Sequence, residues 1–261
     1  MLKIVVDPFT SAKDLGKGTH ASVEFLPGSG VALKESDYIS FFTPMLKGGH
    51  EVLFLPISFK LLKDKGSAIK AAITELKQQF PDGRIEYLDT QSASAATGII
   101  ASLCVTVANA GSMLQDVMEF ALTLIGRFAV VFAVDNLEAV KNDTLFKKAL
   151  KDFPGELVNN KPILCVDNKG ELVLLDKRRG FRAAVNALPK IVQANGLNVA
   201  DYDVIILHGN AKTEAEAVAK TMKELACDNV FVIEIGKALK AKLAGKAVGV
   251  AFHMRLKSDD E

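Results

Sequence analysis

The chain has 261 residues, 49% of them hydrophobic, and a formal net charge of +1 at pH 7. This length allows one large domain or two of ordinary size, and the apolar content is sufficient for a core in each. The near-zero net charge, with lysines and acidic residues interspersed, excludes the basic stripe of a nucleic-acid-binding protein.

The chain opens with a strand-like run at residues 1–7, without the positive start and cleavage site of a signal peptide. The most apolar window, residues 99–110, is too short for a bilayer span and contains polar side chains. Three widely spaced cysteines predict buried free thiols in a reducing compartment, without a disulfide or metal site. We therefore expect a cytoplasmic protein without membrane insertion.

The first half of the chain alternates between strand-like and helix-like segments. Such alternation predicts a mainly parallel sheet flanked by helices, with ligands bound beyond the carboxyl ends of the strands. Residues 16–30 read as a long loop or flap. Strands are expected at 2–6, 50–57, 85–88 and 129–134, and helices at 60–80, 95–110 and 113–128.

A charged helix end followed by Pro154-Gly155 predicts a domain boundary, with an N-terminal α/β domain at 1–152 and a C-terminal α+β domain at 153–261. The second domain is expected to contain a mostly antiparallel sheet. Its strands are expected at 163–166, 172–175, 203–207, 230–235 and 247–252, with a helix at 213–225. The turn at residues 167–170 indicates a hairpin, in which Gly170 can adopt the positive φ of a tight turn.

A basic cluster follows that hairpin. Lys177, Arg178, Arg179 and Arg182 lie just before or within the start of a helix expected from about Phe181. The unpaired N–H groups of a helix start attract anions, so the cluster is a candidate anion or partner site. The alternative is an ordinary solvated charge run.

No motif for catalysis is complete. The glycine-rich stretches near Lys17 and at 28–30 lack residues of the phosphate-binding and dinucleotide-binding patterns. The four histidines lie in unrelated contexts, without a zinc pair or a nucleophile elbow. The hydroxyls of Ser92, Ser94 and Thr97 could cap the helix that follows them or bond a ligand, and of the two we expect capping. The sequence therefore predicts neither an enzyme nor a bound cofactor.

Several segments resemble the DegV family in the same order along the chain. They include Asn-Asn-Lys-Pro-Ile-Leu at 159–164, Arg-Gly at 179–180, Asp-Thr-Gln-Ser-Ala-Ser at 89–94 and Val-Asp-Asn-Leu-Glu-Ala-Val-Lys at 134–141. The resemblance covers nearly the whole chain and implies a two-domain DegV-like fold. It also implies one long-chain fatty acid in an apolar tunnel, whose carboxylate is bonded by hydroxyls and a histidine and presented to a separate fatty acid kinase.

The carboxylate site is where this sequence departs from the family. The family's Ile-Ser-Ser-x-Leu-Ser-Gly-Thr aligns with residues 57–64, in which only Ser58 remains, and Phe59 replaces a serine. Lys242 occupies the position of the family's histidine. The resemblance thus indicates Ser58, Phe59, Lys63 and Lys242 as ligand-binding positions, with Ser58 and either Lys242 or Lys63 at the head group.

The same resemblance places Arg179 and Arg182 toward a partner protein or the exposed head group. An ordinary basic surface helix is the alternative reading of Lys242, because further lysines surround it. Two other functions stay open. One is an interaction or regulatory module that has lost fatty acid binding because Phe59 and Leu62 fill the tunnel. The other is a phosphotransfer enzyme of the dihydroxyacetone kinase type, which rests on fold similarity alone.

Overall fold

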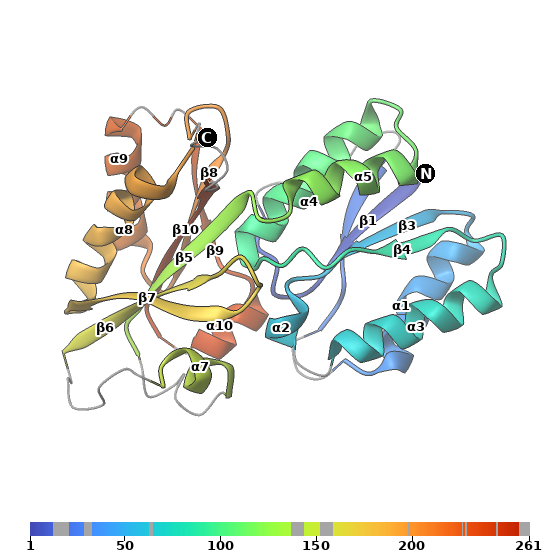
Figure 1. Ribbon diagram of the computed structural model, residues 1–261, viewed down its shortest axis with the longest axis horizontal. Helices are drawn as coiled ribbons and strands as arrows, with labels where there is room; N and C mark the ends of the chain where they lie inside the picture. The colour runs from blue at the N-terminus through green and yellow to red at the C-terminus, as the bar shows by residue number, and fades with distance from the viewer. Residues whose placement is uncertain are drawn as a thin grey trace.

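The protein is described from a computed structural model with two units side by side, each built on one sheet (Figure 1). The structure describes residues 1–12, 21–28, 33–62, 65–136, 144–151, 159–197, 199–225, 227, 229–243 and 245–255. The predicted boundary between residues 152 and 153 lies outside the described residues and stays a prediction.

The first sheet is parallel throughout, as the alternation of segments predicted. Its strands are β1 (Leu2–Val6), β2 (Ala21–Phe25), β3 (Glu51–Leu55) and β4 (Ile85–Tyr87), in the order β2-β1-β3-β4. The reading of all of residues 16–30 as a loop is wrong, because 21–25 form the edge strand. The Lys3 side chain fixes this edge by donating to Ser22 and Glu24 at 3.0 Å each.

Helices cover both faces of this sheet. The pair α1 (Glu35–Lys47) and α3 (Lys65–Gln79) packs on one face through buried aromatic and aliphatic side chains such as Phe42, Phe54 and Ile69. On the other face lie α4 (Ser94–Asn109) and α5 (Leu114–Leu124). The helix expected at 60–80 is split into the short α2 (Phe59–Leu62) and α3.

The second sheet has six strands in the order β7-β6-β5-β10-β8-β9. Only β8 and β9 pair in parallel, which confirms the mostly antiparallel sheet. The strands are β5 (Phe128–Val134), β6 (Asn160–Val166), β7 (Leu172–Arg179), β8 (Val204–Gly209), β9 (Val230–Glu234) and β10 (Ala247–His253).

The assignment of residues 129–134 to the first sheet is wrong. They form β5, which pairs with β6 and with the C-terminal strand β10. Every residue of β5 is buried, and a uniformly apolar strand is stable in the centre of either sheet, so its local pattern does not identify its partners. The change from one sheet to the other occurs between β4 and β5.

Both faces of the second sheet are covered, one by helices and the other by the first unit. The outer layer consists of α8 (Phe181–Asn195) and α9 (Lys212–Glu224), which pack on one face through a separate apolar core. The other face is turned toward the first unit, where α4 contacts both β1 and β5. Near this junction lie α7 (Thr144–Ala149) and α10 (Lys237–Leu243) (Figure 1). Among the described residues, none of the helices is long and apolar enough to cross a membrane.

Candidate functional site

A largely apolar pocket lies where the two units meet. Its walls come from the segments that follow β1, β3 and β4, from α2, α7 and α10, and from the inner face of the six-stranded sheet. The space between its walls is about 670 Å³ when the solvent at its open mouth is included. The apolar lining consists of Phe9, Ile57, Leu61, Ala93, Val130, Phe132, Val134, Phe146, Leu164, Val166, Leu172, Leu239 and Leu243.

A buried carboxylate positions the wall on the side of the first sheet. Asp7 follows β1, is 2% exposed, and accepts hydrogen bonds from the backbone N–H groups of Phe9, at 2.7 Å, and of Ile57. These bonds join the segment after β1 to the segment after β3. As a result, Phe9 and Ile57 line the same pocket.

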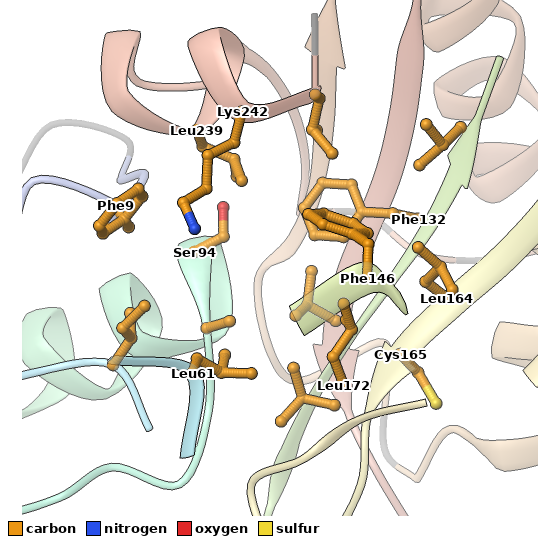
Figure 2. Close-up of a pocket in the computed structure, with 16 residues that line it drawn as sticks. Phe9, Leu61, Ser94, Phe132, Phe146, Leu164, Cys165, Leu172, Leu239 and Lys242 are labelled. Atoms are coloured by element: carbon orange, nitrogen blue, oxygen red, sulfur yellow. The ribbon is translucent and has the colours of Figure 1, made fainter. Parts of the chain in front are cut away.

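The pocket has one polar end, formed by Ser94 and Lys242. Figure 2 shows the Lys242 nitrogen and the Ser94 oxygen pointing toward each other beside the ring of Phe9. The Lys242 Nζ lies 5.5 Å from the centroid of that ring, within the range of a cation–π interaction. A cation and a hydroxyl therefore converge at the edge of an apolar cavity.

The backbone around Ser94 explains how its hydroxyl reaches the pocket. Ser94 has a φ of 50°, which few residues other than glycine adopt. The Ser94 hydroxyl donates to Ser11 Oγ at 3.0 Å. Ser11 Oγ in turn accepts a hydrogen bond from the N–H of Gly236 at 3.4 Å. Ser11 thus links the start of α4 to the residue before α10, so the elements that carry Ser94 and Lys242 are held together.

The expectation that the hydroxyls of this segment cap α4 is wrong. Ala93 is the N-cap residue and makes no side-chain cap bond. The Thr97 hydroxyl lies 3.2 Å from that of Thr90. The turn is held instead by Asp89, whose carboxylate accepts the backbone N–H of Gln91 at 2.9 Å. Burial raises the pKa of Asp89, while its backbone hydrogen bonds act in the opposite direction.

Of the predicted ligand-binding residues that the structure describes, Lys242 lines the pocket. Ser58 does not, although it is completely buried. Its hydroxyl donates to the carbonyl of Gly170 at 2.8 Å and accepts the N–H of Lys60 at 3.2 Å. Ser58 therefore holds the β6–β7 turn against the first unit, and a head-group role would require it to give up this bond.

Phe59 points away from the pocket. Its ring stacks on Tyr87 at a centroid distance of 5.8 Å, and Lys70 Nζ lies 5.6 Å from the ring. Leu62 is buried in the core between the first sheet and its helices. It is Leu61, between them, that lines the pocket. The idea that Phe59 and Leu62 fill the tunnel is therefore wrong, and Lys63 lies outside the described residues.

The predicted partner-facing arginines are not among the residues that line the pocket. Arg179 ends β7 and Arg182 is in the first turn of α8, and both are exposed. The pocket-lining residue of β7 is Leu172, at the opposite end of the strand. The seven residue steps from Leu172 to Arg179 correspond to about 23 Å along β7. Contact of these arginines with a partner or with the exposed head group stays a prediction.

The described lining contains no carboxylate or imidazole that could serve in acid–base catalysis. Burial raises the pKa of the Cys165 thiol to about 11, and its sulfur points away from the cavity (Figure 2). Within the described residues, no group of three His, Cys, Asp or Glu side chains could hold a metal ion. The arrangement is suited to holding an amphipathic anion.

Sequence reasoning missed Ser11 and underestimated Ser94. Both follow strands of a parallel sheet at their carboxyl ends, which is the one signal that could have identified them. The short segments after β1 and β4 give no helical or strand periodicity that would show where a side chain points.

The comparisons with known proteins agree with this architecture. Residues 31–255 match a family model described as "Uncharacterised protein, DegV family". The chain belongs to the DegV family. A DegV domain-containing protein of Clostridium perfringens is 25% identical over 218 residues, which is 83% of this chain and 75% of that protein.

Solved structures of the DegV family share the fold. A fatty acid binding DegV family protein from Streptococcus agalactiae has a TM-score of 0.77 at 18% identity, covering 98% of this chain and 99% of that one. The Fatty Acid Kinase (Fak) B3 protein of Streptococcus pneumoniae, loaded with linoleic acid, has a TM-score of 0.82 at 13% identity, covering 97% and 99%. A stearic acid-binding protein from Eubacterium ventriosum has a TM-score of 0.80 at 16% identity, covering 96% and 97%.

Proposed function

We propose that this protein binds a long-chain fatty acid in the pocket between its two units, with the carboxylate at Ser94 and Lys242. The observation that supports this most strongly is the single polar end of an otherwise apolar cavity. The similar structures from Streptococcus agalactiae and Eubacterium ventriosum, described as fatty acid binding and stearic acid-binding proteins, support a fatty acid as the ligand.

The two ends of the pocket fit the two ends of such a ligand. Each methylene that leaves water contributes about 0.8 kcal/mol, so a long acyl chain supplies most of the affinity. An ionised carboxylate beside an apolar cavity needs a charged or hydrogen-bonding partner. Lys242 supplies the charge, and the N-terminus of the 16-residue helix α4 supplies a favourable dipole. The Ser94 hydroxyl would exchange its hydrogen bond to Ser11 for one to the carboxylate.

We also propose that the protein is a carrier without catalytic activity, located in the cytoplasm, that presents the carboxylate to a fatty acid kinase. Lys242 is partly exposed, so a carboxylate held there would be the accessible part of the ligand. The exposed residues Arg179 and Arg182 are candidates for contact with the kinase.

The test is a comparison of two lysine variants in α10. Lys242→Gln should weaken binding of palmitate to the delipidated protein by about 10- to 100-fold, the range expected when a charged hydrogen-bonding partner is lost. Lys237→Gln is the matched control, because Lys237 is exposed on the same helix and does not line the pocket. Titration calorimetry gives the affinities, and native mass spectrometry of freshly purified protein shows retained lipid as added mass.

The absence of both retained lipid and palmitate binding in the wild type would contradict the proposal and favour an interaction module without lipid. That alternative has lost its structural premise, since Phe59 and Leu62 do not fill the cavity. The phosphotransfer alternative gains no support either, because the described pocket lining contains no histidine.

A further inference from the structure

Phe132, on the side of the pocket opposite its polar end, is paired with a glycine on the neighbouring strand. Phe132 of β5 and Gly249 of β10 are register partners at the centre of the six-stranded sheet. A Cβ atom added to Gly249 would lie 2.5 Å from both Cδ1 and Cε1 of Phe132. The ring therefore lies over the glycine, in space that any other residue would occupy.

The inward-facing residues of β10 on both sides of this contact also have small side chains. Ala247 and Ala251 belong to the same apolar core as Phe132, whereas Val248 and Val250 belong to the core on the other face. The inner face of β10 thus offers little side-chain volume. This leaves Phe132 free to lie along the sheet and keeps the space above it open.

Figure 2 shows Phe132 beside Phe146 of α7, across the cavity from Lys242 and Ser94. Both rings are nearly inaccessible, with exposed fractions of 8% and 4%. Leu164 of β6 lies beyond them. A chain anchored at the polar end would therefore meet the two rings as it extends into the pocket.

From this geometry we propose that Phe132, held against the sheet by Gly249, sets the length of acyl chain that the pocket accepts. This inference rests on the proposed binding of fatty acids. The space available to the chain depends on how far the ring stands above the sheet, and Gly249 determines that height. Closely packed interiors do not absorb such a change without cost, so moving or removing the ring should change the preferred ligand.

The experiment measures the affinities of saturated fatty acids of increasing length for the delipidated wild type and its variants. In Phe132→Ala the preferred chain should become longer by about two to four carbons, because the removed ring leaves a cavity that collapses only partly. Two further buried methylenes correspond to about a tenfold gain in affinity for the longer acid. In Gly249→Ala the ring must rise into the pocket, so the preference should shift to shorter chains.

Two further variants keep the test decisive. Val131→Ala is the matched control, because Val131 is on the same strand but belongs to the core on the opposite face, so this variant should lose stability while keeping the wild-type length preference. If Gly249→Ala fails to fold, the double variant Phe132→Ala/Gly249→Ala still tests the inference, since it lacks the overlap and should prefer longer chains.

An unchanged length preference in folded Phe132→Ala, or an equal shift in Val131→Ala, would overturn the inference while leaving fatty acid binding intact. Failure of the proposed function is distinguishable from this result, because the wild type would then bind no fatty acid of any length.

Discussion

The contact between the β6–β7 turn and the first unit makes a sharp prediction about Gly170→Ala. Gly170 has a φ of 76°, a left-handed conformation that costs a residue with a Cβ about 1–2 kcal/mol. The new Cβ would also overlap the hydroxyl oxygen of Ser58 and lie 3.1 Å from the Ser58 Cβ. With about 1–3 kcal/mol for overpacking, we expect a total destabilisation of about 2–5 kcal/mol.

The matched control is Gly126→Ala. Gly126 has a φ of 79°, and a Cβ there would meet nothing within 4 Å. This variant should therefore show only the backbone cost of about 1–2 kcal/mol. Urea unfolding followed by circular dichroism measures both values, and equal losses for the two variants would refute the argument from steric overlap.

A double-mutant cycle isolates the contact itself. Ser58→Ala should cost about 1–3 kcal/mol, because the buried carbonyl of Gly170 and the N–H of Lys60 lose their partner. The double variant Ser58→Ala/Gly170→Ala should cost less than the two single changes together by about 1–2 kcal/mol, since the overlapping oxygen is absent. Strict additivity would show that the hydroxyl is not the obstacle.

Three further predictions concern segments around the pocket. The hydrogen bond from Lys148 lowers the pKa of Glu171. This pair therefore stabilises the contact of α7 with β7 fully above pH 4.5, the ordinary pKa of Glu171. The stabilisation is lost as the pH falls through the lowered pKa. The Tm difference between Glu171→Gln and the wild type should vanish in acid, and a difference that persists there would contradict this. In Gly98→Ala the new Cβ would overlap the Ser11 carbonyl oxygen. We therefore expect the free energy of unfolding in urea to fall by about 1–3 kcal/mol and palmitate binding to weaken. Increased stability would show that the Ser11 segment moves aside without cost. Burial raises the pKa of the Cys165 thiol to about 11. Iodoacetamide should therefore label Cys165 slowly at neutral pH and faster as the pH approaches this pKa, which mass spectrometry can follow. Rapid labelling at neutral pH would refute this.

Much of the fold was readable in the sequence because it depends on local patterns. The uniform apolar runs of β1 and β3 and the helical periodicity of α3 predicted a parallel sheet with helices. The turn ending in Gly170 predicted the hairpin and its positive φ, which the structure confirms. The ordered motifs of the DegV family predicted the pairing of these elements into two units.

The site was only partly readable, and Ser58 and Ser94 show why. Both are serines that follow strands of the first sheet, and both are buried. The Ser58 hydroxyl donates to the carbonyl of Gly170, a residue far along the chain, whereas Ser94, whose hydroxyl donates to Ser11, is turned toward the cavity by an unusual backbone conformation. Neither cause leaves a periodic signal near the serine itself.

The sequence by itself determined the family, the class of each unit and the absence of a complete catalytic motif, because these depend on residue identity and short-range order. Only the tertiary structure decided that β5 joins the second sheet, that Ser94 and not Ser58 stands beside Lys242, and that Phe59 faces away from the pocket. Each of these depends on contacts between segments distant in the chain, where packing and hydrogen-bond satisfaction select one arrangement among several that the local sequence allows.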